Sequence, residues 1–220
     1  MTGARALGTI AAMTSRTQWR VPAALIALNL IPVGAGAFRT AQLVGGAEVT
    51  EANARFFAAP VPVLLHIVGA SAFCVVGAFQ FVPSLRGRSR WHRAAGRFLI
   101  PCGLVGALSG LWMAFAHPLP PEDGDLLAAF RLLFGGIMVA GLVLGYAAVR
   151  RRDFAAHRAW MLRAYAVAAG AGTQAVVYGS WMVLVGTPGV TGKALLMALG
   201  WSINLAVAER VIRRRVPIAV

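Results

Sequence analysis

The stretch Arg150-Arg-Arg-Asp-Phe-Ala-Ala-His-Arg-Ala-Trp-Met-Leu-Arg-Ala-Tyr165 lies between two long apolar runs and gathers five arginines into sixteen residues. The chain as a whole is 59% hydrophobic and only 13% charged, whereas about one quarter of an average soluble domain is charged. This contrast predicts an integral membrane protein in which the basic stretch connects two membrane spans. The expected fold class is all-α, a polytopic helical bundle.

Six apolar segments are long enough to cross a hydrocarbon core, which takes about 20 helical residues. The predicted spans cover residues 21–44, 61–82, 98–116, 126–149, 164–185 and 193–209. Together they form one transmembrane domain over 21–209, between a cytoplasmic N-terminal segment (1–20) and a basic cytoplasmic tail (210–220). Ala35-Gly36-Ala37 resembles a signal-peptidase site, but we expect an uncleaved first helix because its apolar run is long and more spans follow.

The charges of the predicted loops alternate along the chain. If both termini are cytoplasmic, the inner segments hold 17 basic and two acidic residues, whereas the outer loops hold three basic and five acidic residues. This bias follows the positive-inside rule, so both termini are expected in the cytoplasm. The formal net charge of +14 is therefore divided among short loops, which argues against a nucleic-acid partner. The expected partners are the bilayer with its anionic headgroups, and a membrane protein or a second copy of the chain.

Two inner loops each place a histidine at the start of a helix. His92 is expected to follow an N-cap at Ser89, and His157 an N-cap at Asp153. The positive end of the helix dipole and the nearby arginines favour neutral imidazole rings, which can accept hydrogen bonds or ligate a metal. Because the two helices run parallel, the rings can face each other across the bundle.

Two interpretations of this inner cluster are open. In the first, His92 and His157 are axial ligands of a b-type haem iron, with Met161 as a spare ligand. The haem propionates would then be paired with Arg93, Arg97, Arg158 and Arg163. In the second, the histidines hydrogen-bond the loops, while the arginines and nearby aromatic residues hold phospholipid headgroups.

A second polar cluster is expected on the outer side. His66 and Arg131 lie at the same depth inside the second and fourth spans, and His117 lies at the nearby surface. A charge inside a span is costly and normally faces the bundle interior with a partner. The cluster is either a site for an anion, a quinone headgroup or a proton path, or a structural pair in which Arg131 reaches the outer carboxylates.

The remaining polar residues of the spans are expected to hold helices together. Those assigned a structural role are Gln80, Gln174, Asn204 and Glu209. The glycine pairs Gly106/Gly110 and Gly141/Gly145 predict close helix contacts within the bundle, with an oligomer interface as the alternative. The chain has no phosphate-binding glycine loop and no zinc-type Cys/His spacing, which leaves a hydrolase or an ATP-driven pump without support.

Several ordered stretches between His66 and Glu209 carry a family resemblance. They are His66-Ile-Val-Gly69, Gln80-Phe-Val-Pro-Ser-Leu-Arg86, His92-Arg-Ala-Ala-Gly-Arg97, Ser109-Gly-Leu-Trp112, Arg151–Tyr165 and Trp201-Ser-Ile-Asn-Leu-Ala-Val-Ala-Glu209. Together they resemble the bacterial membrane family called domain of unknown function 2306. The resemblance implies a multi-pass protein of the bacterial inner membrane and implies no activity. The usual family pattern has an arginine inside the fifth span, whereas here Gln174 is the strongest polar group there.

The working hypothesis is a membrane redox component that binds haem b or a quinone between the histidine-bearing helices. The alternatives are a non-enzymatic membrane partner or assembly subunit, and a transporter of a small molecule or ion. Whether the protein is an enzyme is left open by the sequence.

Overall fold

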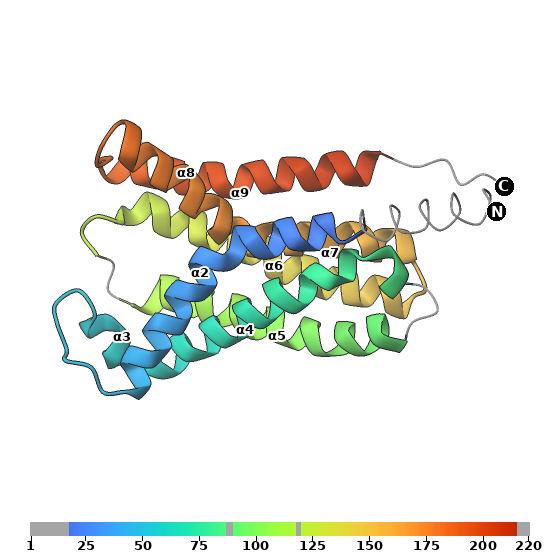
Figure 1. Cartoon of the computed structure of the whole chain (residues 1–220), viewed down its shortest axis with the longest axis horizontal. Coiled ribbons are helices and arrows are strands. Elements are labelled where there is room, and N and C mark those ends of the chain that lie inside the picture. Colours follow the sequence, from blue (N-terminus) through green and yellow to red (C-terminus); the bar gives the residue numbers. More distant parts are fainter. Residues whose placement is uncertain (1–17, 87–89, 118–119, 215–220) are drawn as a thin grey trace, which may run out of the picture.

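The structure, a computed structural model, describes residues 18–86, 90–117 and 120–214. These residues are mostly helical and form no strand, which confirms the all-α class. Figure 1 shows the long helices packed side by side in a bundle. Residues 1–17 of the predicted N-terminal segment (1–20), residues 215–220 of the tail (210–220) and the expected N-cap Ser89 lie outside the described residues.

Within the described part of the chain, five helices are long and apolar enough to cross a membrane. They are α2 (Arg20–Val44), α4 (Pro60–Ala78) with its 3-10 extension η1 (Phe79–Phe81), α5 (Arg90–Ala116), α6 (Gly124–Arg150) and α9 (Val190–Arg213). They correspond to five of the six predicted spans. The largest difference in their bounds is at α5, which begins at Arg90 rather than at residue 98 because the basic segment already forms its first turns.

The fifth predicted span, 164–185, is wrong as a single helix. The chain forms α7 (Phe154–Ala168), which begins ten residues before the predicted span, and α8 (Gly170–Leu184), which leaves in another direction after Ala169. Glycine favours such a break because it has no side chain and costs a helix more entropy than other residues. Two glycines near the break are also in close contact with other helices: the Trp201 indole packs on Gly170, and the Leu28 carbonyl lies against Gly172.

Asn204 of α9 holds this bend. Its Nδ2 donates to the Ala166 carbonyl at 3.1 Å, and its Oδ1 accepts a hydrogen bond from the Thr173 hydroxyl at 2.8 Å. A helix break in apolar surroundings frees backbone carbonyls that need another donor. Asn204 supplies one such donor and ties both α7 and α8 to α9.

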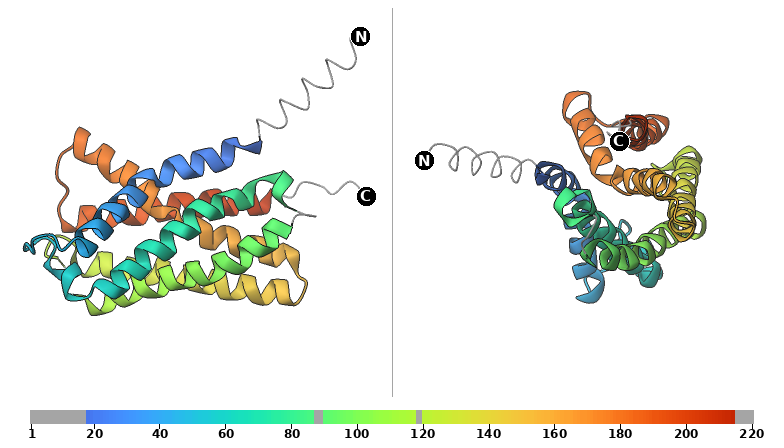
Figure 2. Two further views of the ribbon diagram at one scale, coloured as in Figure 1. Left: turned by 60° about the horizontal axis from the view of Figure 1, so that its bottom comes forward. Right: turned by 90° about the vertical axis from the view of Figure 1, so that its right-hand side faces the viewer.

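The connections between helices gather at the two ends of the bundle. α2 begins, α5 begins and α9 ends at the same end as residues 82–86 and the connection 151–153, and we call this the basic end (Figures 1 and 2). The opposite end holds the connections 45–59 and 185–189, the residues 120–123 and the short helix α3 (Ala54–Ala58). At the basic end, the 3-10 turn η2 (Pro83–Leu85) follows α4 and η1.

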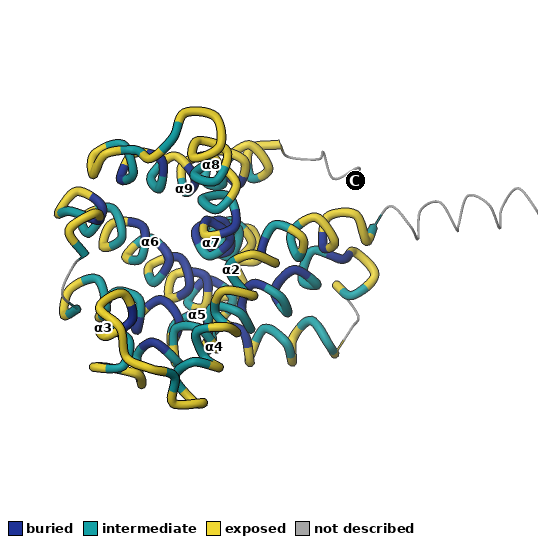
Figure 3. The backbone as a smooth tube through the Cα atoms, turned by 60° about the vertical axis from the view of Figure 1, so that its left-hand side comes forward, coloured by how far each residue is buried: buried dark blue, intermediate teal, exposed yellow. Residues whose placement is uncertain are grey.

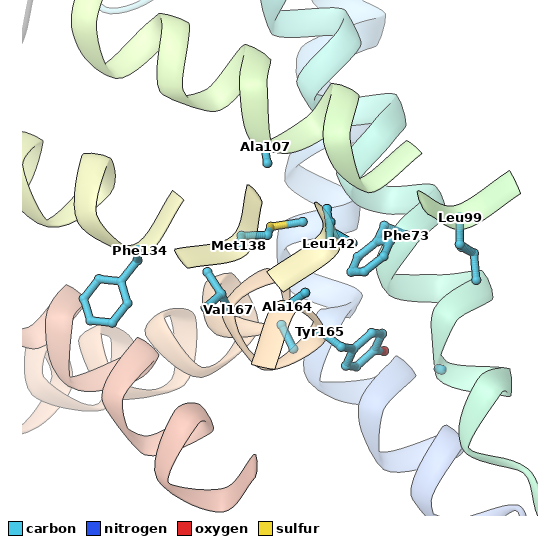
Figure 4. Close-up of a cluster of buried hydrophobic side chains, with 11 residues drawn as sticks. Phe73, Leu99, Ala107, Phe134, Met138, Leu142, Ala164, Tyr165 and Val167 are labelled. Atoms are coloured by element: carbon cyan, nitrogen blue, oxygen red, sulfur yellow. The ribbon is translucent and has the colours of Figure 1, made fainter. Parts of the chain in front are cut away.

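The core lies where α4, α5, α6 and α7 meet (Figure 4). Tyr165 donates from its hydroxyl to the Cys74 carbonyl at 2.7 Å and packs against Phe73. Large apolar residues face outward instead, as in Leu30, which is 63% exposed, and the exposed colour in Figure 3 covers the ends and the outward faces. This distribution suits a protein surrounded by lipid, because outward side chains there need not be polar.

Glycines set the closest helix contacts. A Cβ on Gly69 of α4 would lie 2.7 Å from the Cys102 carbonyl oxygen and 2.8 Å from the Gly106 nitrogen on α5. On α6, Gly141 packs against Ala164 of α7, and Gly145 packs against Met161. The prediction that these glycines form contacts within the bundle is therefore confirmed.

Candidate functional site

A cavity of about 390 Å³ lies in the half of the bundle opposite the basic end. Its polar lining comes from Arg55, His66, His117, Arg131 and Gln174. The rest of the lining is apolar and includes Phe56, Leu111, Met113, Leu127, Met138, Val167, Met197 and Trp201. The structure thus brings all three residues of the predicted outer cluster, His66, His117 and Arg131, to one cavity. We call it the outer cavity.

His66 is held in one orientation and one tautomer. Its Nδ1 lies 2.8 Å from the Gly106 carbonyl oxygen. Because a carbonyl only accepts hydrogen bonds, Nδ1 must carry a proton, and in the neutral ring Nε2 then has a lone pair. Gly110 makes room for the ring, since a Cβ there would lie 3.0 Å from Nδ1. Among the described residues Nε2 has no hydrogen-bond partner, so His66 offers the cavity an acceptor.

Arg131 is paired with a carboxylate that the sequence did not single out. Its Nη1 lies 2.8 Å from Asp123 Oδ2, and Lys193 Nζ lies 2.6 Å from Asp123 Oδ1. The Asp123 side chain is only 4% exposed. Burial raises the pKa of Asp123, but the hydrogen bond from Lys193 and the charge of Arg131 outweigh it and hold the pKa below its usual value. Arg131 thus does both things expected of it: it pairs with an outer carboxylate, and it lines the outer cavity.

His117 brings a further polar atom into this region. Its Nε2 is buried and has no hydrogen-bond partner within the described ranges, while its ring packs edge-on against Trp112 with centroids 5.4 Å apart. Burial and the positive charge of Arg55 lower the pKa of His117. Buried polar atoms are usually paired, so an orphaned ring nitrogen at the cavity is available to a ligand.

Gln174 and Trp201 form the wall on the side of α8 and α9. Gln174 donates from Nε2 to the Met197 carbonyl at 2.9 Å, which joins the two helices. Trp201 stacks on Phe134 with ring centroids 4.7 Å apart. Gln174 therefore lines the cavity, and it has a structural contact at the same time.

The inner histidines are also near each other, at the basic end. His92 and His157 are close enough for an electrostatic interaction. The His157 Nδ1 lies 2.8 Å from the Gly145 carbonyl, so it donates and leaves the lone pair on Nε2. The predicted N-cap Asp153 is confirmed, because its side chain accepts from the Ala156 N–H at 2.9 Å. Neither histidine lines the outer cavity.

The spare haem ligand and the arginines predicted for the haem propionates differ in how far other residues already contact them. The methyl group of Met161 packs on Gly145, where a Cβ would meet it. Arg163 makes a bidentate pair with Glu209, at 2.6 and 3.2 Å, and lies over the Trp160 ring. The arginines Arg93, Arg97 and Arg158 are exposed. Of the four expected propionate partners, Arg163 is thus already engaged by a carboxylate.

Arg86 and Gln80 link the turn after α4 to α5. Arg86 donates to the carbonyls of Gln80 at 3.0 Å and Phe81 at 2.7 Å, and Gln80 donates weakly to the His92 carbonyl at 3.4 Å. Burial and the charge of Arg158 lower the pKa of Arg86. Gln80 Oε1 and His92 Nδ1 are buried without a partner among the described residues. Within residues 18–86, 90–117 and 120–214, no group of three or more His, Cys, Asp or Glu side chains could hold a metal ion.

A family model described as "Predicted membrane protein (DUF2306)" matches residues 63–212, a range that contains both histidine clusters. Comparison with curated proteins and with solved structures gave no match. The family match covers more than half of the 220 residues, and the helices of the same region are long and apolar enough to span a membrane. The chain therefore belongs to this family of predicted membrane proteins, and it is an integral membrane protein.

Proposed function

We propose that the protein crosses the bacterial inner membrane six times, with both termini in the cytoplasm. In this arrangement the bent pair α7–α8 makes the fifth crossing, which neither helix of 15 residues makes alone. The support is the gathering of the inner arginines at one end of the bundle, which the positive-inside rule assigns to the cytoplasm. The outer cavity then lies in the half of the membrane away from the cytoplasm.

We further propose that the outer cavity binds a quinone and that the protein is a membrane redox component. The observation that carries this proposal is that one largely apolar cavity presents both a hydrogen-bond acceptor and a hydrogen-bond donor. His66 presents the lone pair of Nε2, whereas the Arg131 guanidinium can only donate. A quinone carbonyl accepts from such a donor, and a quinol hydroxyl donates to such an acceptor. Both redox forms of the ligand therefore find a complementary partner.

The size and the lining of the cavity support the same ligand class. An apolar cavity of about 150 Å³ is enough to bind benzene, and ligand pockets commonly range from about 300 to 1,000 Å³. At about 390 Å³, the outer cavity has room for a substituted ring. Its apolar walls, with Trp201 among them, suit a flat ring that partitions into the membrane.

The test is binding of a tail-less benzoquinone to the purified protein in lipid nanodiscs, measured by equilibrium dialysis. We expect Arg131→Gln to weaken binding of the benzoquinone about tenfold and His66→Ala to weaken binding of the corresponding quinol about tenfold, because each variant removes the hydrogen bond, worth about 1–2 kcal/mol in a buried site, to that redox form. The matched control is His157→Ala, which removes a histidine at the opposite end and should leave the dissociation constant unchanged. Equal losses in all three variants would contradict a site at the outer cavity.

Binding of the benzoquinone to the wild-type protein is the test of the proposal itself. Failure of any benzoquinone to bind at concentrations that saturate known quinone sites would overturn it. The hypotheses of a non-enzymatic membrane partner and of a transporter would then be the ones left to examine.

Haem ligation by His92 and His157 stays a prediction. The His157 Nε2, which has no hydrogen-bond partner among the described residues, and the nearness of the two rings favour it, whereas Met161, the spare ligand, packs on Gly145 of α6. Absorption spectra after expression with added haem provide the measurement. A bound b-type haem requires a Soret band that disappears in His157→Ala and persists in His117→Ala, and a colourless wild-type preparation contradicts it.

A further inference from the structure

A second, smaller cavity of about 100 Å³ lies beside the outer cavity. The two cavities share four lining residues: His66, Ala70, Ala168 and Ala171. The second cavity is bounded by α2, by α4 and by the bend between α7 and α8. His66 and three alanines therefore line both spaces, and the three alanines have small side chains.

The lining of the second cavity beyond these shared residues comes from two helices. It is made by Asn29, Pro32, Val33 and Gly36 of α2 and by Ile67, Ser71 and Cys74 of α4. From His66 to Cys74 the cavity follows α4 for about 12 Å, at 1.5 Å per residue. Since α4 runs from the outer half toward the basic end, this direction leads from the outer cavity toward the middle of the bundle.

Two close contacts of α2 lie on either side of this space. The Leu28 carbonyl of α2 lies against Gly172 of α8, and Gly36 lies against Ile67 of α4, where a Cβ would be 2.9 Å from Ile67 Cγ2. The cavity is lined by the segment of α2 between these contacts. Leu30 and Ile31 on the same segment are each 63% exposed, so the outward side of α2 faces lipid.

The volume of the second cavity excludes a ring. It is below the roughly 150 Å³ that holds benzene, but a hydrocarbon chain is narrower than a ring. Its walls are largely aliphatic, and the Asn29 side chain turns its Nδ2 to the Leu25 carbonyl at 2.8 Å. The space therefore suits an apolar chain attached to a group in the outer cavity.

We infer that the second cavity is a subsite for the apolar tail of the quinone, whose ring occupies the outer cavity. The inference rests on the proposed function. The ring binds between His66 and Arg131, and the tail passes Ala70, Ala168 and Ala171 to lie between α2 and α4. The site thereby selects a tailed quinone over a polar molecule of the same ring size.

The experiment compares two ligands in nanodiscs: a tail-less benzoquinone and the same ring with a tail of about four carbons, the length that about 100 Å³ can enclose. Val33→Phe adds bulk to a residue that lines only the second cavity. We expect it to weaken binding of the tailed ligand at least about tenfold and to change binding of the tail-less ligand less than about twofold. Ser71→Leu fills the same space from α4 and should act in the same way.

The matched control is Leu30→Phe, which adds an aromatic ring to the lipid-facing side of the same helix. It should leave the affinity for both ligands unchanged. Unchanged binding of the tailed ligand to Val33→Phe and Ser71→Leu would overturn the tail subsite, as expected if the cavity holds water at Asn29 and Ser71 instead. Equal losses for both ligands would also overturn it. If the tail-less ligand does not bind the wild-type protein, the proposed quinone site itself is wrong. That outcome is distinguishable from loss of the tail subsite alone, in which the tail-less ligand still binds.

Discussion

Replacement of Gly69 by valine is expected to lower the thermal midpoint of unfolding by about 6–12 °C in detergent micelles. A Cβ at Gly69 would lie 2.7 Å from the Cys102 carbonyl oxygen and 2.8 Å from the Gly106 nitrogen. These are backbone atoms, so no side chain can rotate away, and α4 must separate from α5. Overpacking of this kind costs about 3 kcal/mol, and about 2–4 °C accompany each kcal/mol in a chain of this size.

The same substitution should weaken quinone binding, because the hydrogen bond from His66 to Gly106 spans the α4–α5 contact. The matched control is Gly96→Ala on α5, where a Cβ meets nothing within 4 Å. Alanine is the better helix former, so this variant should lose no stability. Unfolding of Gly69→Val at the wild-type temperature would show that α4 and α5 are not in backbone contact.

Removal of the Asp123 carboxylate, by Asp123→Ala, is expected to lower the free energy of unfolding by about 2 kcal/mol. The substitution leaves two positive charges, on Arg131 and Lys193, without their common partner. Removing one member of a buried ion pair costs about 3–5 kcal/mol. The smaller figure applies here because the Arg131 side chain is 37% exposed, and water screens part of the effect. Thermal unfolding measures the change.

The Asp123 carboxylate should also make stability depend on pH. Its pKa in the folded protein is below that in the unfolded chain, which is about 3.9. The folded state therefore binds fewer protons in this range, and the stabilisation is present above about pH 4 and is lost as the pH falls through the folded pKa. Asp123→Ala should lack this part of the acid sensitivity, whereas Asp125→Ala, which removes an exposed carboxylate, should retain it. Identical acid profiles for wild type and Asp123→Ala would refute the assignment.

The bend between α7 and α8 shows what hydrophobicity alone cannot predict. Residues 164–185 are mostly apolar and carry no charge, so a single span is the natural expectation. At the break, Trp201 and Leu28, which come from distant parts of the chain, lie against two glycines. The only local indication is the pair Gly170 and Gly172, and helices in membranes often tolerate glycine.

The outer cluster was partly predictable. A histidine and an arginine at equal depth inside two spans already indicated that His66 and Arg131 belong together. Their common cavity, and the fixed tautomer of His66, depend on the rotation of each helix and on the Gly106 carbonyl. The sequence offers no means to choose Asp123 over Glu122 or Asp125 as the partner of Arg131, because the three acidic residues differ in burial and not in chemistry.

The sequence by itself determined the helical class, the membrane environment and the approximate bounds of five spans, because these depend on hydrophobicity summed along each segment. Only the tertiary structure decided where α7 bends, which carboxylate holds Arg131, and that His66, His117 and Arg131 surround one cavity beside a second. The physical reason is that these features depend on distances between residues far apart in the chain. Such distances are set by how the helices rotate and pack, and no local pattern encodes them.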